Sequence, residues 1–456
     1  MTIDLAALGI PTALQTFEAT HSAALARLAA IHPAAYARTR NALDGAVTGL
    51  SPYFTHGLVS LPDAARSVCA RHTLGFDDKL VFEWGWRAFF HHVWSRAGDG
   101  GDAILRDMHS GMPWHGQYAA SVPNDIREGR TGVPAIDSAV KTLYATGYLH
   151  NHARMWLASY VVHLRKVHWR AGADWLYGHL LDGDLPCNHL SWQWVAGTFS
   201  NKPYLFNAEN VLRYAPAGNR AAWASPGTVI DTSYEELDAI ARLKGDVGPE
   251  FSQRGQRSGD AGTAEPALHG TPPAACLDLL PRQPLQPPFS QPTSEAIKQP
   301  PDLSKSPIYA SFMPVAQSIP PYYAIENIAN KNLELVHPWA LAPRLPSGNT
   351  VRLGVIHLPA HANWPWSERR WSFVLQAMAG VTDALWVGDL TQLAVSHAAR
   401  VTAQATQFPG YRQALAALAT PSAAPQLFAN PAMACRSFSK FYDQARRQAA
   451  QFSDLL

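Results

Sequence analysis

The sequence has few cysteines, no long apolar run and little net charge, and each shortage excludes a class of protein. Its four cysteines are far apart and form no C-x-x-C pair, which indicates a reduced, cytoplasmic protein. No apolar run approaches the roughly 18 residues of a membrane span, and the opening MTIDLAALG lacks the basic region of a signal peptide. The net charge of +2 excludes a strongly basic nucleic-acid coat, so any nucleic-acid contact must come from a local patch.

The composition divides the chain into three parts. Residues 1–243 show helical periodicity, including AALARLAAIHPAAYARTRN and SYEELDAIARLKG, without a strong run of alternating strands. Residues 244–334 are rich in Gly and Pro and are typical of an extended or disordered linker. The sequence therefore predicts a mainly α fold, in which a helical domain is followed by a linker and a small module over 335–456.

The last part carries a β-α-β pattern. VRLGVIHLP (351–359) predicts a buried strand, and DALWVGD (383–389) predicts a second one. Between them, SERRWSFVLQAMAG (367–380) predicts a helix that Ser367 caps and Gly380 ends. We expect a small α/β module with a parallel sheet, and its lack of a G-x-G-x-x-G or Walker pattern gives no sign of a bound nucleotide.

Two helix faces in the first part carry polar groups among aromatic ones. Glu83, Trp86 and Phe90 stand at i, i+3 and i+7, with Arg87 one step round the same helix. Tyr148, Asn151 and Met155 repeat this spacing, with Arg154 beside them. Polar groups on apolar faces are costly unless a partner satisfies them, and a large, flat ligand with polar edges, such as a flavin, would do so.

At these residues the chain resembles the photolyase/cryptochrome flavoproteins. The resemblance runs from about Tyr36 to Pro216 and rests on motifs in the family's order: LSPYFTHG (50–57), EWGWRAFF (83–90), GRTGVPAIDSAV (129–140), GYLHNHARM (147–155), DGDLPCN (182–188) and WQWVAG (192–197). Typical members place an α/β antenna domain before the helical domain, whereas here an α/β module follows it. The arrangement is similar to short photolyase-like proteins that lack the N-terminal antenna.

The resemblance implies that the helical domain binds FAD. It assigns cofactor contacts to Tyr36, Thr48, Ser51, Arg87, Phe90, Tyr148, Asn151, Arg154, Asp182, Asp184 and Asn188. Hydroxyls at a helix start suit a diphosphate, although Ser51 can also be an ordinary N-cap with Pro52 at the first helical position. A cation near the flavin edge stabilises the reduced ring, although DGD can also be a solvated turn beside a surface arginine.

The resemblance also implies a pocket for UV-damaged DNA. Glu83, Trp86, Asn151 and Met155 match positions that line the family's lesion pocket, where a flipped pyrimidine dimer needs a carboxyl, an aromatic platform and apolar walls. Relatives that repair (6-4) photoproducts have histidines at the last two positions, so we expect cyclobutane dimers as the substrate. His152 stands where repair enzymes commonly have an arginine near DNA phosphates, which weakens this contact and favours single-stranded DNA.

Three further residues match positions that serve electron transfer. Asn188 falls where the family places the residue facing flavin N5, and a neutral amide there favours repair over sensing. Trp192 and Trp169 match the inner and middle positions of the tryptophan chain that passes electrons to the flavin, while Trp114 and Tyr118 both fall near the outer one. Ordinary core packing is the alternative for each tryptophan.

No metal site is expected. The pairs His91–His92 and His150–His152 cannot converge on one ion from a helix, the cysteine spacing does not support the iron–sulfur cluster of some relatives, and no Ser-His-Asp arrangement is evident. The sequence does not indicate the oligomeric state. The C-terminal module either covers helical surface or serves a second chromophore or a partner.

Three functions remain open from the sequence. The first is an antenna-less, FAD-dependent DNA photolyase, which is a lyase that repairs dimers in light. The second is a cryptochrome-like blue-light receptor without repair activity, in which the linker and the C-terminal module form the output device. The third is a light-independent flavoprotein that uses the scaffold for redox work or nucleic-acid binding.

Overall fold

The computed structural model describes residues 3–97, 118–200, 202–243, 330–343 and 348–456. Most of the predicted linker, 244–329, and also Trp114, lie outside the described residues. Within the described part, the fold is mainly helical with one small parallel sheet, as the sequence predicts.

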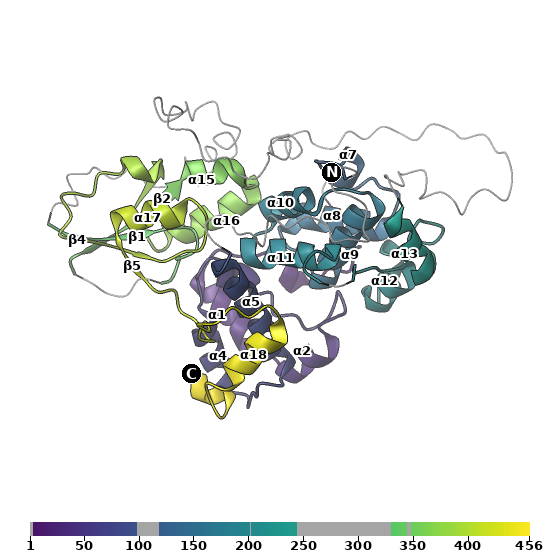
Figure 1. Ribbon diagram of the computed structural model, residues 1–456, viewed down its shortest axis with the longest axis horizontal. Helices are drawn as coiled ribbons and strands as arrows, with labels where there is room; N and C mark the ends of the chain where they lie inside the picture. The colour runs from purple at the N-terminus through teal and green to yellow at the C-terminus, as the bar shows by residue number, and fades with distance from the viewer. Residues whose placement is uncertain (1–2, 98–117, 201, 244–329, 344–347) are drawn as a thin grey trace.

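The N-terminal part forms a helical domain (Figure 1). Its helices are α1 (His21–Ala29), α2 (Pro33–Thr39), α3 (Ser51–Thr55), α4 (Leu61–Cys69), α5 (Lys79–Ser95), α7 (Asn124–Arg127), α8 (Pro134–Thr146), α9 (Asn151–Ser159), α10 (Trp169–His179), α11 (Leu185–Ala196), α12 (Ala208–Tyr214) and α13 (Tyr234–Arg242). A π-helical turn, Tyr160–Leu164, extends α9, and short 3-10 turns lie at Thr12–Leu14 and Arg220–Ala222.

Local sequence signals explain where several of these helices begin and end. The apolar pattern over residues 23–41 forms two helices, because Pro33 cannot donate an N–H inside a helix and instead takes the first helical position of α2. Ser233 caps α13 by accepting a hydrogen bond from the N–H of Glu236. Helices α8 and α11 end at Gly147 and Gly197, which adopt the left-handed conformation that glycine tolerates best.

The C-terminal part contains a parallel sheet of strand order β3-β2-β1-β4-β5. Its elements are β1 (Asn332–Val336), β2 (Thr350–His357), α15 (Leu358–Asn363), α16 (Glu368–Ala379), β3 (Ala384–Gly388), a 3-10 turn (Leu390–Gln392), β4 (Arg400–Gln404), α17 (Tyr411–Leu418), β5 (Thr420–Ser422), α18 (Phe438–Arg446) and a 3-10 turn (Phe452–Leu455). Strand β2, helix α16 with Ser367 as its N-cap, and strand β3 all lie where the sequence predicts them. Strand β1 begins inside the range that we assign to the linker.

The C-terminal part touches the helical domain at two separate places (Figure 1). Helix α16 packs against α10, and the N–H of Ser367 donates to the carbonyl of Gly178. Helix α18 lies apart from the sheet, beside the purple helices of the N-terminal part, and packs against α5. The chain therefore returns to the helical domain after completing the sheet.

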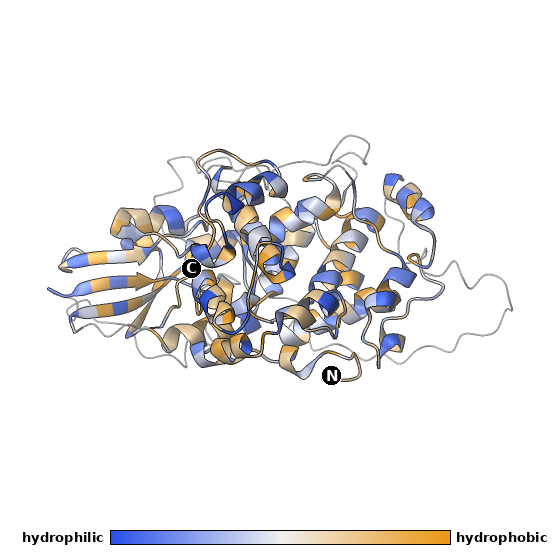
Figure 2. Ribbon diagram, turned by 90° about the horizontal axis from the view of Figure 1, so that it is seen from below, coloured by the Kyte–Doolittle hydropathy of each residue, from blue (hydrophilic) through white to orange (hydrophobic). Residues whose placement is uncertain are grey.

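Apolar side chains of both parts join one buried core. Strand β2 is buried over most of its length, as expected for a parallel strand that is covered on both faces, and the strands at the left of Figure 2 alternate between apolar and polar residues. Among the described helices, none combines the length and the apolar character needed to cross a membrane.

Candidate flavin and lesion site

A cavity of about 340 Å³ opens between α5, α9 and α11 of the helical domain. The predicted site residues that line it are Tyr36, Thr48, Ser51, Glu83, Trp86, Arg87, Phe90, Tyr148, Asn151, Arg154, Met155, Asp182, Asp184, Asn188 and Trp192. Trp169 is the one predicted site residue that does not line the cavity. Residues spread over more than 150 positions thus meet at one cavity.

Helix α9 is held at its first turn by a neutral histidine. His150 is the N-cap: its Nδ1 accepts a hydrogen bond from the N–H of His152 at 3.1 Å, and its Nε2 lies 2.9 Å from the carbonyl of Arg40. Burial lowers the pKa of His150 to about 3, so the ring is neutral and Nδ1 keeps the lone pair that the cap needs. This cap fixes the start of the helix that carries Asn151, Arg154 and Met155.

Asp182 offers a buried acceptor to the cavity. Its Oδ2 accepts a hydrogen bond from Arg154 Nη2 at 2.7 Å, while its buried Oδ1 has no partner among the described residues. The DGD sequence is therefore not a solvated turn, and Arg154 is not a free surface arginine. Because an unpaired buried carboxylate oxygen is costly, a ligand with an N–H or O–H group is expected to donate to Oδ1.

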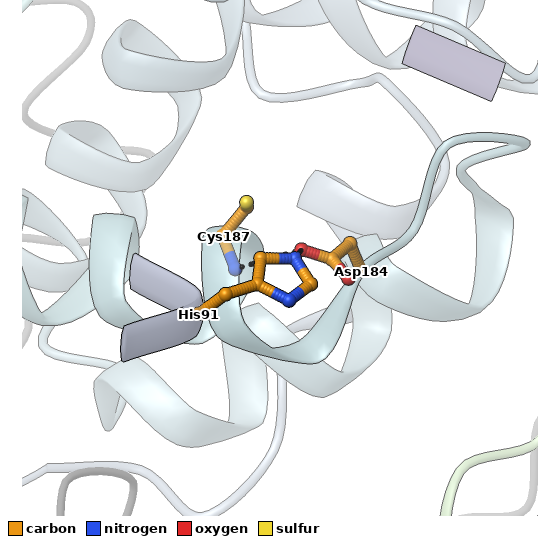
Figure 3. A group of neighbouring side chains, drawn as sticks. All are labelled: His91, Asp184 and Cys187. Carbon is orange, nitrogen blue, oxygen red and sulfur yellow. Dashed lines mark hydrogen bonds and ion pairs between the residues drawn. The ribbon is translucent and has the colours of Figure 1, made fainter. Parts of the chain in front are cut away.

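Asp184 lies at the centre of a hydrogen-bond network on the same turn (Figure 3). Its Oδ2 lies 3.0 Å from His91 Nε2 and 3.2 Å from the N–H of Cys187, and Arg87 Nη1 is 3.6 Å away. Burial alone would raise the pKa of Asp184, but His91 and Arg87 outweigh it, so this pKa lies well below its usual range. Asp184 therefore stays ionised and also caps α11.

His91, Asp184 and Cys187 also form a group of potential metal-ligand atoms, all within 4.8 Å of one another. Their surroundings favour a hydrogen-bond network instead. Arg87 Nη1 lies 3.7 Å from Cys187 Sγ, which places a cation where a metal would bind. Burial also raises the pKa of the Cys187 thiol well above its usual value, so the sulfur keeps its proton.

Asn188 presents its carbonyl side to a ligand. Its Nδ2 donates to the carbonyl of Ala173 at 2.9 Å and lies 3.4 Å from His189 Nδ1. His189 is fixed in turn, because its Nε2 lies 2.8 Å from Asp174 Oδ1. With both amide hydrogens directed to the chain, Asn188 Oδ1 is left as an acceptor for an N–H group.

Glu83 has a partner that the sequence did not reveal. Its carboxylate lies 3.6 Å from Arg40 Nε, and 43% of its side chain is exposed to the cavity and solvent. Desolvation in the cavity raises the pKa of Glu83, and Arg40 opposes this shift. Arg40 also lines the cavity, although its place in the helical ARTRN run looks like an ordinary solvated charge.

His152 lines the cavity as a neutral ring. Burial and the nearby Arg40 lower the pKa of His152 to about 4, and the ring packs 4.5 Å from that of Tyr214. A neutral histidine cannot replace the positive charge of an arginine beside a phosphate.

Thr48 and Ser51 lie at the start of α3, where the cavity reaches this helix. The N-cap is Leu50, and Ser51 is already the first helical residue, so the alternative of Ser51 as an ordinary N-cap is wrong. The Ser51 hydroxyl is therefore not used for capping, whereas Thr48 Oγ1 accepts a weak hydrogen bond from the N–H of Leu50 at 3.3 Å.

The two tryptophans of the expected electron path lie on the packed pair α10 and α11. Trp192 is buried and lines the cavity, and its ring covers Gly172, where an added Cβ would come within 2.3 Å. Trp169 is fully buried, 6.3 Å from the ring of His189 between centroids. Tyr118, the candidate for the outer position that the structure describes, is also buried.

The residues present fit FAD. The cavity joins an aromatic wall, two arginines, the unpaired Asp182 Oδ1 and the Asn188 carbonyl, which match a flat, polar-edged ring with a negatively charged tail. Figure 3 shows the Asp184 network lying where the DGD turn enters α11. Arg87 and Arg154 supply positive charge on either side of this turn.

The comparisons with known proteins agree with this fit. The family described as the FAD binding domain of DNA photolyase matches residues 80–222. A deoxyribodipyrimidine photo-lyase of Thermus thermophilus is 36% identical over 214 residues, 46% of this chain and 50% of its own. A cryptochrome DASH of Ostreococcus tauri is 30% identical over 192 residues, 41% of this chain and 35% of its own.

A solved cryptochrome of Synechocystis aligns with 50% of this chain and 53% of its own, at 23% identity and a TM-score of 0.38. This chain thus spans half or less of the curated relatives that it matches here. The family match covers α5, α9 and α11, the helices between which the cavity opens. Residues 80–222 thus form an FAD-binding domain of the DNA photolyase type, and the cofactor of the helical domain is FAD.

Proposed function

We propose that this protein is a cytoplasmic photolyase that repairs cyclobutane pyrimidine dimers in UV-damaged DNA, with a preference for single strands. The observation that carries the proposal is the shared cavity: Glu83, Trp86 and Met155 line the same space as Asp182 and Asn188. A dimer bound at the first group would therefore lie against a flavin held by the second. Bound and reduced FAD supplies, on absorbing light, the electron that splits the dimer and afterwards returns.

The chain's own residues prepare this reaction. Asp182, Arg87 and Arg154 bind and orient the flavin, and the two arginines favour its reduced, more negative state. Asn188 is uncharged, and its Oδ1 can accept a hydrogen bond from an N–H group of the flavin. Trp86 offers a ring for the dimer to stack on, and Met155 supplies an apolar wall.

Glu83 is suited to hydrogen-bond the dimer. Desolvation raises the pKa of Glu83, which favours the protonated carboxyl, and the O–H of that form can donate to a pyrimidine carbonyl. That contact strengthens as negative charge develops on the dimer, so it favours splitting over mere binding. Arg40 lies beside it and keeps positive charge near the same carbonyl.

The single-strand preference rests on His152. A neutral ring at this position removes one phosphate contact, and duplex DNA, from which the dimer must be flipped, depends most on such contacts. Single-stranded DNA does not require that flipping.

The test is the recovery of thymine absorbance in UV-irradiated oligothymidine, mixed with FAD-loaded, reduced protein, in blue light and in darkness. We expect recovery only in light, strongly reduced in Glu83→Gln and retained in Glu209→Gln. Glu209 is a matched, exposed carboxylate that pairs with Arg213, and neither residue lines the cavity. Recovery in darkness, or none in light, contradicts the proposal.

A blue-light receptor is the second candidate, and the neutral His152 favours it because weak DNA contact suits a sensor. It predicts that the FAD-loaded protein photoreduces in blue light without restoring thymine absorbance. A protein that neither repairs nor photoreduces would instead support a light-independent flavoprotein.

A further inference from the structure

A buried arginine of the C-terminal module reaches the flavin-binding turn of the helical domain. Arg370, in the first turn of α16, is fully buried. Its Nη2 donates to the carbonyl of Gly183 at 2.6 Å, and its Nη1 donates to the carbonyl of Tyr177 at 2.6 Å. The guanidinium lies 3.9 Å from the ring centroid of Trp366 and 4.4 Å from that of Tyr177, so aromatic rings enclose it.

Burying the charged guanidinium of Arg370 in the first turn of a helix costs free energy of folding. A cation in the first turn of a helix opposes the helix dipole, and complete burial removes the water that would solvate the charge. Arg370 Nε has no hydrogen-bond partner among the described residues. Burial lowers the pKa of Arg370, and Tyr177 and the carboxylates of Asp182 and Asp184 oppose this shift only in part. The carbonyl oxygen of Gly183 in the turn accepts a charge-assisted hydrogen bond from the guanidinium, which offsets a further part of the cost.

The glycine of the DGD turn is shaped for this contact. A Cβ added at Gly183 would lie 2.3 Å from Arg370 Nη1 and 2.7 Å from the carbonyl oxygen of Tyr177. The second of these atoms is backbone and cannot move aside cheaply. Because Gly183 has no Cβ, the guanidinium of Arg370 can approach the backbone of the turn closely.

Neighbouring carbonyls of the turn are held as well. His56 Nε2 lies 2.8 Å from the carbonyl of Leu181, while its Nδ1 lies 2.7 Å from the carbonyl of Pro338 in the C-terminal module. Thr55 Oγ1 donates to the carbonyl of Asp182 at 3.3 Å. The turn is thus fixed on its backbone side, which leaves the aspartate side chains to the cavity.

The carboxyl edge of the parallel sheet is used for this docking. In open parallel sheets, ligands bind at the carboxyl ends of the strands where the strand order reverses, which here lies between β1 and β4. Trp339, just after β1, stacks on Phe408, just after β4, at 4.3 Å, and Tyr411 packs edge-on against Trp339 at 5.1 Å. Side chains of the module itself therefore occupy the position at which such a fold would hold a nucleotide.

We propose that Arg370 is a positioning residue of the flavin site, and that the C-terminal α/β module completes this site. By fixing the Gly183 carbonyl, Arg370 holds Asp182 and Asp184 in the orientation that binds the flavin, and its charge offsets theirs. The inference rests on the flavin site described above and does not require repair activity.

The experiment compares Arg370→Met with Arg369→Met, a matched change at the adjacent, exposed arginine, which makes one hydrogen bond to the carbonyl of Tyr144. The dissociation constant of FAD and the midpoint potential of the bound flavin are measured in darkness without DNA. For Arg370→Met we expect FAD to dissociate about tenfold more readily or worse, and the potential to become more negative because a nearby positive charge is lost. Arg369→Met should match the unchanged protein.

Arg370→Lys keeps the charge and the apolar stem but cannot donate to both carbonyls in the planar geometry of a guanidinium. We expect it to restore the potential in part while FAD binding stays weakened. If Arg370→Met does not fold, Arg370→Lys with an unchanged melting temperature of the FAD-free protein carries the test. FAD affinity and potential equal to those of the unchanged protein in the folded variants overturn the inference.

These outcomes are separate from those of the proposed function. A protein that binds FAD through Arg370 but leaves irradiated oligothymidine unrepaired disproves the photolyase and leaves the inference intact. Repair that persists with unchanged FAD affinity in Arg370→Lys supports the photolyase and removes Arg370 from the flavin site.

Discussion

Phe438 of α18 stacks on Trp86 of α5, with ring centroids 4.0 Å apart and planes inclined by 7°. The two residues are 352 positions apart in the sequence. Gly85, beside Trp86, allows this approach, because a Cβ there would come within 2.6 Å of the ring of Tyr442. One face of the proposed lesion platform is therefore supported by the C-terminal helix.

We expect Phe438→Leu to loosen Trp86 while keeping an apolar side chain in place. Loss of the aromatic stack should cost about 1 kcal/mol of unfolding free energy, and the KM for irradiated oligothymidine should rise more than kcat falls. Phe428→Leu is the control, because Phe428 packs on Tyr442 and Phe452 within the C-terminal segment. Equal KM values in the two variants would show that Phe438 supports stability alone.

Arg40 should set the pH at which Glu83 titrates. Arg40→Met removes the main influence that opposes desolvation and leaves only the weaker one of Lys79, so the pKa of Glu83 should rise further. A pH profile of dimer binding should then shift to higher pH relative to the unchanged protein. A profile that stays in place would mean that Glu83 does not titrate in the binding step.

Asn188→Asp should make the bound flavin harder to reduce. A carboxylate would stand beside the flavin and would face the Ala173 carbonyl that now accepts a hydrogen bond from the amide. Both effects disfavour added negative charge, so the midpoint potential should become more negative. Unchanged accessible redox states would remove Asn188 from the flavin edge.

His152→Arg should strengthen DNA binding through one added phosphate contact. The plot of log affinity against log salt should steepen by about 1, and duplex DNA should gain more than single-stranded DNA. Fluorescence anisotropy with irradiated oligonucleotides at several salt concentrations measures this. An unchanged slope in both forms would exclude His152 from the phosphate path.

Acid should weaken the fold through His150. Its pKa is 6.5 in the unfolded chain and about 3 when folded, so between these values the unfolded state binds more protons. The free energy of unfolding should therefore fall as the pH drops below 6.5, by about 1.4 kcal/mol per pH unit for this group. The stabilisation is fully present above pH 6.5 and is lost towards pH 3.

Denaturant unfolding across this range measures the effect. His150→Asn, which keeps an acceptor for the N-cap but does not titrate, should flatten the pH dependence. His397→Asn, at an exposed surface histidine, should leave it unchanged. A slope in His150→Asn equal to that of the unchanged protein would show that other groups cause the acid sensitivity.

The sequence predicts the parts of the site that repeat along one helix or one turn. Glu83, Trp86 and Arg87 share a face of α5, and helical spacing alone brings them together. Arg370 shows why other residues of the site cannot be predicted from the sequence. It lies 187 positions from Gly183, and SERRW has the charge pattern of a solvated helix start. Nothing local in the sequence distinguishes the buried Arg370 from the exposed Arg369.

The role of His91 beside Asp184 was not predicted from the sequence for a different reason. Its neighbour His92 suggests a metal pair, but the two rings point to different partners, His91 to Asp184 and His92 to Asn430. Pairing between α18 and α5 was likewise invisible, because a short amphipathic helix does not reveal which surface it covers. The contacts of His91 and of α18 therefore depend on which distant segments the fold brings together, and residue type alone does not predict them.

The order of the chain has a consequence for how the protein acquires its cofactor. Arg370 and the α18 helix are synthesised long after the turn and the helix that they hold. When only the helical domain has left the ribosome, the Asp182–Asp184 turn lacks its hydrogen bond from Arg370. Helix α5 likewise lacks the contact between Trp86 and Phe438 of α18. Tight binding of FAD should then come late in biosynthesis, so a bound flavin would indicate that the C-terminal module and α18 have been made and folded.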